Sequence, residues 1–450
     1  MILLFSLLIL SFEGFSSCVA DFDQDVSSLG AFSLHGVGAY AAGFYKEMEG
    51  DEGGLLVRSI DQIRNFGGRS NEKMVSVEDY GAKGGGADDT MAFEKAWNAA
   101  CSSDSPVSLL IPKGNTYLLK PITFSGPCNS DISVMIEGTI EASSNPSDWN
   151  GKNQRLWIYF NKVNNLAVLG GGTINGNGKV WWQKSCKVDK SQPCKDAPTA
   201  LTFNSCNWLR VESLNVINSQ QIHVEFENSK NIIVSSLSIS APGNSPNTDG
   251  IHVTRTQNIT INHCTIATGD DCISIVTGSQ DVHANNIICG PGHGISIGSL
   301  GAKGSTAQVS GVTVNTAQFS GTSNGVRIKT WQGGKGYAKN IVFKNIEMSN
   351  VKNPIIIDQN YCDSKRPCGQ QKSAVQVSNV QYSNIKGTSA SKFAMNFNCS
   401  KSFPCSGIVL EDIDLVKNGG GSAKSFCANV KWSKEGTVIP PPCALQLEDA

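Results

Sequence analysis

A short phrase that recurs through most of the chain constrains the fold more than any other feature of the sequence. Each copy begins with a turn-forming residue, usually Asn or Asp, and continues with apolar residues at alternate positions. Because the side chains of a β-strand point alternately to opposite faces, this alternation predicts a strand at every copy. The copies begin at Asp131, Asn165, Asn207, Asn231, Asn258, Asp281, Gly311, Asn340 and Asn379.

The spacing of the phrase indicates how the strands are arranged. In the middle of the chain it returns every 23 to 30 residues, with a second short alternating run in the interval and almost no helical pattern. This period is typical of a β-solenoid, in which each repeat stacks only on its neighbours. A leucine-rich horseshoe would show a leucine skeleton, which is absent, whereas a β-sandwich of many short strands stays an alternative. We expect an all-β fold, a right-handed single-stranded parallel β-helix.

The composition fits a stack of short coils. The chain of 450 residues has 46 glycines, and only 17% of its residues are charged. Frequent turns favour Gly and Asn, Asn also forms ladders between coils, and a narrow buried core leaves few positions for charge. The same values exclude a disordered chain and a long helical array. With 37 basic and 38 acidic residues, nothing suggests a nucleic-acid partner.

The open end of a solenoid exposes strand edges, so it needs a cap. The strongest helical pattern in the chain runs from Asp88 to Cys101, with acidic residues and Thr90 at its start and apolar residues at helical spacing. It precedes the first copy of the phrase, where an N-terminal cap belongs. The expected architecture is therefore a β-helix with one short N-terminal capping helix.

The first 72 residues differ from the rest of the chain. Residues 2–12 are apolar and are followed by a small-residue cleavage pattern ending at Ala20, so residues 1–20 are predicted to be a secretory signal peptide. Residues 21–72 carry nine acidic and four basic side chains, a net charge of −5. They are interpreted as a solvated acidic arm or as a removable pro-segment. With Glu13 and a chain total of −1, residues 73–450 sum to +5 and are expected to form the β-helix domain.

Three further features agree with secretion. No stretch is apolar and long enough to span a membrane, since the N-terminal run is too short. Cleavage after Ala20 removes Cys18 and leaves 14 cysteines, an even number suited to an oxidising route. Sequons at Asn258 and Asn398 fit a glycoprotein.

Four polar clusters lie in consecutive predicted coils. They are Asn247-Thr248-Asp249-Gly250, Gly269-Asp270-Asp271-Cys272, Gly292-His293-Gly294 and Arg327-Ile328-Lys329. Asp249, Asp271 and His293 follow one another at intervals of 22 residues, about one coil, so we expect them to stack on one face. Arg327 and Lys329 are two apart on a strand, so their side chains share a side.

Taken singly, each cluster has a plain structural explanation. An isolated acid pair is usually a solvated turn, a lone histidine is usually structural, and Arg-x-Lys is usually an exposed strand face. Together at coil spacing they indicate a site, because stacked carboxylates repel one another. Acids beside a histidine and two cations suit a site that binds an anion and handles protons. Gly269 is expected to give the backbone the freedom to turn Asp270 and Asp271 toward one cleft.

These clusters resemble the motifs of the polygalacturonases, the pectin-degrading enzymes of glycoside hydrolase family 28. The resemblance extends from about residue 74 to residue 443 and is greatest for the secreted plant enzymes. Four further phrases are similar to those of the family: Gly81-Ala-Lys83, Gly171-Gly-Thr-Ile-Asn-Gly176, Gly290-Pro-Gly-His-Gly-Ile-Ser-Ile-Gly298 and Gln359-Asn-Tyr-Cys362. Together these motifs are highly specific.

The resemblance implies hydrolysis of α-1,4 links between galacturonates in pectin, with inversion at the anomeric carbon and without a cofactor or metal. Carried over to this sequence, Asp270 is the general acid that protonates the departing oxygen, and Asp249 and Asp271 hold and deprotonate the attacking water. Inverting enzymes place their carboxyl groups about 6.5–9.5 Å apart to fit that water. Neighbouring carboxylates are expected to keep Asp270 protonated, and His293 is expected to assist in holding and supplying protons at the site.

The resemblance also implies how the substrate is held. Arg327 and Lys329 grip the galacturonate carboxylate, Tyr361 lies at a substrate subsite, and Asn247 begins the Asn-Thr-Asp motif of the substrate site. Arg255 stands where related microbial enzymes often carry another polar residue. It is either a further anion contact or, as we expect, an exposed strand residue.

The pairing of the cysteines is suggested by their separations, although sequence alone does not establish it. A Cys272–Cys289 disulfide would pin two neighbouring coils at the site. Reasonable further pairs are Cys101–Cys128, Cys186–Cys194, Cys362–Cys368, Cys399–Cys405 and Cys427–Cys443. Cys206 and Cys264 are left over in strand phrases as buried thiols, and no spacing of cysteine with histidine suggests zinc.

Three functions are compatible with this scaffold. The first is a secreted, monomeric polygalacturonase of the plant cell wall that loosens the wall or separates cells, with endo action expected and exo action left open. The second is a pectate lyase, which eliminates rather than hydrolyses. The third is a wall protein that binds oligogalacturonate without cleaving it. Release of reducing ends, an unsaturated product that absorbs ultraviolet light, or binding alone would distinguish them.

Overall fold

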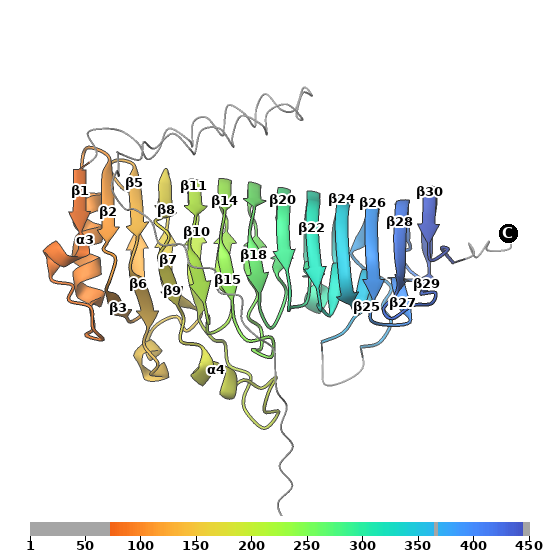
Figure 1. Ribbon diagram of the computed structural model, residues 1–450, viewed down its shortest axis with the longest axis horizontal. Helices are drawn as coiled ribbons and strands as arrows, with labels where there is room; N and C mark the ends of the chain where they lie inside the picture. Colours follow the sequence, from red (N-terminus) through yellow and green to blue (C-terminus); the bar gives the residue numbers. More distant parts are fainter. Residues whose placement is uncertain (1–72, 364–367, 444–450) are drawn as a thin grey trace, which may run out of the picture. The chain divides into compact units, whose positions relative to one another are not determined.

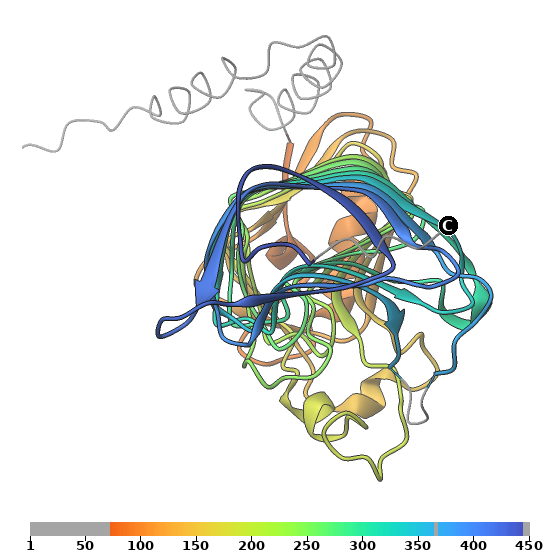
Figure 2. The ribbon, with the colours of Figure 1, turned by 90° about the vertical axis from the view of Figure 1, so that its right-hand side faces the viewer.

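The computed structural model describes residues 73–363 and 368–443. The predicted signal peptide and acidic arm, residues 1–72, lie outside the described residues. The described chain winds into successive coils whose strands form two sheets with parallel neighbours (Figure 1). In Figure 2, which looks along the stack, the coils lie over one another. The predicted right-handed parallel β-helix is confirmed.

The larger sheet has 19 strands. They are β1 (Lys73–Ser76), β2 (Val107–Ile111), β3 (Thr116–Leu119), β5 (Ile132–Ile136), β6 (Thr139–Ala142), β8 (Leu166–Leu169), β9 (Thr173–Asn175), β11 (Asn207–Glu212), β12 (Asn215–Ile217), β14 (Lys230–Ser235), β15 (Ser238–Ser240), β17 (Gln257–Asn262), β18 (Thr265–Ala267), β20 (Gln280–Cys289), β22 (Thr306–Ser320), β24 (Lys335–Val351), β26 (Gln376–Ser389), β28 (Cys405–Lys417) and β30 (Val430–Ile439). Every copy of the recurring phrase lies in this sheet or directly before one of its strands.

The smaller sheet has 11 strands. They are β4 (Ile122–Ser125), β7 (Leu156–Asn161), β10 (Thr199–Asn204), β13 (Val224–Glu227), β16 (Ile251–Thr254), β19 (Ile273–Ile275), β21 (Ile295–Leu300), β23 (Asn324–Trp331), β25 (Asn353–Tyr361), β27 (Phe393–Asn398) and β29 (Lys424–Ala428). Each inner strand pairs with the corresponding strand of the coils before and after it, and the end strands β4 and β29 pair on one side.

Apolar residues of the smaller sheet form a column through the core. Ile251 is in register with Ile273, Ile273 with Ile295, and Ile295 with Val326. All four side chains are fully buried. Since burying one such side chain stabilises a fold by about 1.5–3 kcal/mol, this column fixes the register of the coils that carry the polar clusters.

Asparagine ladders hold the turns between coils. Asn258 Nδ2 donates to Asn231 Oδ1 at 2.8 Å, and Asn384 Nδ2 donates to Asn345 Oδ1 at 2.8 Å. All four residues have a positive φ, a conformation that Asn tolerates better than other non-glycine residues. The side-chain amide therefore satisfies a neighbour while the backbone makes a sharp bend.

The predicted cap is helix α3 (Thr90–Cys101), which covers the β1 end of the stack (Figure 1). Asp88 Oδ1 accepts from Thr90 N at the start of the helix. Trp97, only 2% exposed, packs against Phe124 and Phe160 of the first coils. The remaining helices are short: α4 (Lys179–Gln183), η2 (Val77–Tyr80), η3 (Pro146–Trp149) and η4 (Ala302–Gly304).

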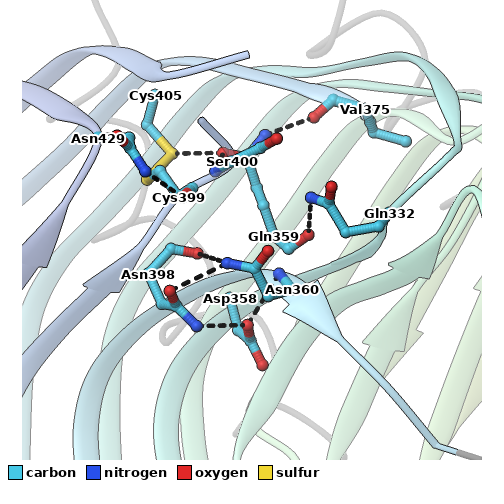
Figure 3. Close-up of a disulfide and its surroundings, with 10 residues drawn as sticks. All are labelled: Gln332, Asp358, Gln359, Asn360, Val375, Asn398, Cys399, Ser400, Cys405 and Asn429. Atoms are coloured by element: carbon cyan, nitrogen blue, oxygen red, sulfur yellow. Dashed lines mark hydrogen bonds between the residues drawn. A yellow bond between two sulfur atoms is a disulfide. The ribbon is translucent and has the colours of Figure 1, made fainter. Parts of the chain in front are cut away.

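All six suggested disulfides are present, and Cys206 and Cys264 are buried thiols, as predicted. Figure 3 shows the surroundings of Cys399–Cys405. There the buried Gln359 donates to Val375 O and accepts from Ser400 N, both at 2.8 Å. Each bond joins Gln359 to another coil.

The sequon asparagine Asn398 also appears in Figure 3, where its Nδ2 donates to Asp358 Oδ1 at 3.3 Å. Glycosylation at Asn398 and Asn258 stays a prediction. Among the described residues, no helix has the length and apolar character needed to cross a membrane.

Candidate active site

The four polar clusters meet at a cleft of about 470 Å³ beside the smaller sheet. Its lining includes every predicted site residue: Asn247, Asp249, Asp270, Asp271, His293, Arg327, Lys329 and Tyr361. The sequence spacing explains this convergence. Because Ile251, Ile273 and Ile295 are in register, Asp249, Asp271 and His293 hold equivalent positions two residues before three successive strands.

Gly269 is needed for a different reason from the one we expected. Its φ does not lie in the left-handed range, but a Cβ built on it would collide with Ser245 O of the preceding coil. The glycine therefore permits a close approach of two coils rather than an unusual backbone turn. Gly269 N also donates to Thr248 Oγ1 at 3.0 Å, which joins the two acidic clusters.

Asp271 is the most enclosed of the three carboxylates, with a side chain only 2% exposed. Ser296 Oγ and Arg327 Nη2 donate to its Oδ1 at 2.8 and 2.7 Å, and Lys329 Nζ donates to its Oδ2 at 2.9 Å. A buried carboxylate needs such partners, because an unpaired charge there costs several kcal/mol. Arg327 and Lys329, expected to grip substrate, thus hold Asp271 in the free protein.

Asp270 is paired with His293. His293 Nδ1 lies 2.9 Å from Asp270 Oδ1, and Asn247 Nδ2 donates to Asp270 Oδ2 at 3.4 Å. Burial raises the pKa of Asp270, but the hydrogen bond and charge of His293 and the charge of Lys329 outweigh burial and lower the pKa below its ordinary range. The free protein therefore differs from the expectation that neighbouring carboxylates keep Asp270 protonated, because a closer cation opposes them.

Asp249 has the opposite shift. Burial, followed by the charges of Asp270 and Asp271, raises its pKa well above the ordinary value. Within the described residues its carboxylate forms no ion pair, and its hydrogen bond comes from Ser274 Oγ at 2.7 Å. A carboxyl group with a raised pKa is a stronger base once it has lost its proton.

A hydrogen-bonded chain extends from Asp249 to a histidine that our sequence analysis missed. His252 Nδ1 lies 2.7 Å from Ser274 Oγ, which in turn donates to Asp249 Oδ2. Burial lowers the pKa of His252 to about 4, so its imidazole is neutral over most of the physiological range. A neutral ring can donate to Ser274 while Ser274 donates to an ionised Asp249.

The spacing of these missed residues along the sequence could have pointed to them. His252, Ser274 and Ser296 follow at intervals of 22 residues, and the strand register places them in one column with Arg327. Because Ser is common on solvent-facing strand positions, the repeat of this spacing was the only clue. The column supplies hydrogen bonds to two of the three carboxylates.

Asp270, Asp271 and His293 bring one potential ligand atom each within 4.8 Å of one another, as a metal site would require. The donors already have other partners: Arg327 and Lys329 occupy both oxygens of Asp271, and His293 binds Asp270. A divalent cation would have to displace these two cationic side chains. The donor set is therefore better suited to protons and an anionic ligand than to a metal.

Tyr361 and Arg255 have different surroundings. Lys329 Nζ lies 5.5 Å from the centre of the Tyr361 ring, which packs edge-on against Trp331. Burial raises the pKa of Tyr361 to about 12. Arg255 is not part of the cleft lining; it is exposed and forms an ion pair with Glu227. Arg255 is exposed as expected, but it lies in the bend directly after β16 rather than in a strand.

Comparisons with known proteins agree with this geometry. A parallel β-helix whose cleft combines three carboxylates, a histidine and two cations has the features of a glycoside hydrolase that acts on an acidic sugar. The family model of glycosyl hydrolases family 28 matches residues 101–438. The chain belongs to that family.

Several curated relatives are similar over most of their length. Polygalacturonase-2 of Solanum lycopersicum is 55% identical over 416 residues, covering 92% of this chain and 88% of the relative. A polygalacturonase of Malus domestica is 59% identical over 370 residues, covering 82% and 79%. Polygalacturonase QRT2 of Arabidopsis thaliana is 54% identical over 374 residues, covering 83% and 85%.

Solved structures share the fold at low sequence identity. The exopolygalacturonase of Thermotoga maritima superposes with a TM-score of 0.70 at 21% identity, covering 85% of this chain and 96% of that one. The polygalacturonase of Erwinia carotovora gives 0.68 at 23% identity, covering 82% and 98%. These likenesses support the β-helix.

Proposed function

We propose that this glycoside hydrolase cleaves α-1,4 links between galacturonates in pectin by an inverting acid–base mechanism. The observation that carries the proposal is the group of Asp249, Asp270 and Asp271 in one cleft with Arg327 and Lys329. Carboxylates alone would repel an acidic polysaccharide, whereas the two cations attract it. The curated relatives, which are named polygalacturonases, support the same substrate.

In this mechanism Asp270 protonates the departing glycosidic oxygen. His293, whose Nδ1 lies 2.9 Å from Asp270 Oδ1, is the group placed to supply a proton to Asp270. Asp249 and Asp271 orient the attacking water, and Asp249 removes its proton. Bond cleavage and water attack on opposite faces of the sugar then invert the anomeric carbon.

The substrate carboxylate binds Arg327 and Lys329, whose side chains reach the cleft although both also hold Asp271. An arginine has five N–H donors, so one guanidinium can bind a protein carboxylate and a sugar carboxylate together. Tyr361 contributes an aromatic wall and Asn247 an amide beside Asp270.

A decisive test uses Asp270→Asn. The substitution keeps shape but removes the transferable proton, so turnover of polygalacturonate should fall about 10²–10⁴-fold. Reducing ends measure the rate, and proton NMR of the first product measures inversion. Turnover near that of the wild type would refute the assignment of Asp270. Loss of activity in a chelator, or an unsaturated product absorbing ultraviolet light, would instead indicate a lyase.

The proposal also covers the location of the protein and the segments into which its chain is divided. Residues 1–20 act as a secretory signal, residues 21–72 form an acidic arm or a pro-segment, and residues 73–450 form the catalytic domain. The mature protein is a secreted monomer that acts endo-wise on plant cell-wall pectin, in wall loosening or cell separation. Product sizes test endo action, because a spread of oligomers indicates endo cleavage and monomer alone indicates exo cleavage.

A further inference from the structure

An ion pair joins two segments that are far apart in the sequence and that both line the catalytic cleft. Lys187 Nζ lies 2.7 Å from Asp363 Oδ1 and 2.8 Å from Asp363 Oδ2, although the two residues are 176 positions apart. Neither residue takes part in the proposed proton transfers or in holding Asp271. The position of this ion pair relative to the sheet indicates what it does.

The two residues are attached at opposite edges of the smaller sheet. Lys187 lies in the segment between β9 and β10, so it is connected to the edge at which the parallel strands begin. Asp363 follows Tyr361, the last residue of β25, and is connected to the edge at which the strands end. The six residues of β10 separate these edges by about 17 Å, because a strand rises about 3.3 Å per residue. The ion pair therefore joins the two walls of the cleft.

The ion pair also spans the coils that carry the site. In the order of the smaller sheet, β13, β16, β19, β21 and β23 lie between β10 and β25. The three carboxylates and His293 lie next to β16, β19 and β21, and the two cations lie on β23. Figure 1 shows α4 and the segment after it projecting from the stack. The cleft therefore lies between the smaller sheet and this ion pair.

Both segments are anchored close to the charged residue. The lysine directly follows Cys186, which is bonded to Cys194, and the aspartate directly follows Cys362, which is bonded to Cys368. At the base of the first segment, Trp182 Nε1 donates to a backbone carbonyl oxygen at 3.0 Å. Anchored segments lose less conformational freedom when their tips meet, which favours formation of the ion pair.

The ion pair is exposed, so it opens and closes readily. The side chains of Lys187 and Asp363 are 47% and 51% exposed. Exposed ion pairs contribute little free energy, because water solvates both charges well when the pair is open. An internal stretch of a polymer can then enter the cleft from the side, and the pair can form again once the polymer lies in the cleft.

We propose that Lys187 and Asp363 form a clasp that closes over a polysaccharide chain and retains it between successive cleavages. The inference rests on the proposed function, because it takes the occupant of the cleft to be an acidic polymer that is cut at internal links. The clasp residues bind each other rather than the sugar. They therefore determine the number of cuts made in one encounter, not the chemistry of a cut.

The experiment measures how many reducing ends are released from polygalacturonate for a given fall in viscosity. Repeated cuts on one retained polymer raise this ratio, whereas single random cuts lower the viscosity with few new ends. Lys187→Gln and Asp363→Asn each remove the ion pair at an exposed position. Each should lower the ratio roughly two- to fivefold. The double variant Lys187→Asp with Asp363→Lys reverses the pair and should restore most of the ratio.

Lys386→Gln is the matched control, because it removes an exposed ion pair with Glu347 on strands of the larger sheet, outside the cleft lining. It should leave the ratio unchanged. High salt should lower the wild-type ratio toward that of the clasp variants, which have no such ion pair left to screen.

The outcomes separate two failures. A wild type that releases no reducing ends from polygalacturonate would overturn the proposed function. An active wild type whose ratio is the same in Lys187→Gln and Asp363→Asn would overturn the clasp alone. A ratio that falls in Lys187→Gln but rises in Asp363→Asn would also overturn the clasp, because Lys187 would then hold the polymer directly and Asp363 would only compete for it.

Discussion

Asp249 and Asp270 are neighbouring carboxyl groups whose pKa values shift in opposite directions. The difference arises from their partners, since Asp270 faces His293 whereas Asp249 faces the neutral Ser274. In the free protein the carboxyl proton is therefore held by Asp249 at a pH where Asp270 is ionised. The proposed reaction reverses this distribution, because Asp270 has to carry the proton and Asp249 has to lose it before the glycosidic bond breaks.

The bond from Ser274 should set the lower pH limit of activity. It lowers the pKa of Asp249, so Ser274→Ala should raise that pKa. Asp249 would then need a higher pH to lose its proton and act as base. The acid limb of the kcat/KM profile should move up by roughly half to one pH unit, since a hydrogen bond contributes about 0.5–1.5 kcal/mol.

Ser238→Ala is the control, because Ser238 is an exposed serine on β15 outside the cleft. It should leave the profile unchanged. In Ser274→Ala, the acid limb of the kcat/KM profile could stay in place while kcat/KM falls at every pH. That result would mean that Ser274 affects structure rather than the pKa of Asp249.

The two buried histidines should make folding sensitive to acid. Burial lowers the pKa of both His223 and His252 to about 4, below the value near 6.5 of an exposed histidine. The unfolded chain therefore binds more protons between these values. Their contribution to stability is complete above about pH 6.5 and is lost as pH falls through about 4.

Thermal unfolding measured from neutral pH to about pH 4 tests this sign. The Tm should fall with pH in the wild type and fall less in His252→Gln, which does not titrate. The raised pKa of Asp249 acts in the opposite direction, because the folded state then holds a proton more tightly. If Tm falls equally steeply with pH in the wild type and in the variant, protonation of His252 does not destabilise the fold.

Several residue roles could not be predicted from the sequence. Asp249, Asp271 and His293 were found because their types and spacing are both unusual. His252 and Ser274 share the spacing but are ordinary strand residues, so only the hydrogen-bond geometry assigns them to the site. The ion pair of Lys187 with Asp363 was equally unpredictable, because the two residues are 176 positions apart and meet only in the folded chain.

Helix α3 packs two aromatic side chains, Phe93 and Trp97, into the core. Trp97 is buried against Phe124 and Phe160, and its Nε1 donates to Ser125 O at 3.1 Å. Trp97→Ala should lower the free energy of unfolding by about 3–5 kcal/mol. Denaturant titration measures the loss.

Met91→Ala is the matched control on the same helix, since Met91 is 67% exposed. Its effect should stay within about 0.5 kcal/mol. Equal small losses in both variants would contradict the view that α3 closes the end of the core by packing.

The two sheets differed in how well the sequence predicted them. The recurring phrase located strands of the 19-stranded sheet, whose Asn or Asp turns and alternating apolar residues give a strong pattern. Strands of the 11-stranded sheet, such as β16 and β19, are only three or four residues long and carry the polar column of the cleft. At the strands that position the active site, polar functional residues thus interrupt the alternating apolar pattern.

For the whole molecule, charge is distributed unevenly along the chain. Residues 73–450 sum to +5 while the complete chain totals −1. If the cleft cations attract an acidic polysaccharide, salt should weaken binding by screening. KM for polygalacturonate should rise roughly three- to tenfold between low and high salt, with kcat nearly constant. A KM that is independent of salt would contradict the role of the cations in binding.

The stacking of the coils also determines where unfolding begins. Each coil of a solenoid is stabilised chiefly by the coils on either side, so unfolding starts at a terminal coil, which has one neighbour instead of two. The residues of the active site lie between β15 and the end of β25, in the interior of the stack and away from both terminal coils. Fraying at an end therefore has to progress through intact coils before it reaches the cleft. Such an enzyme would continue to work while its extremities open and close.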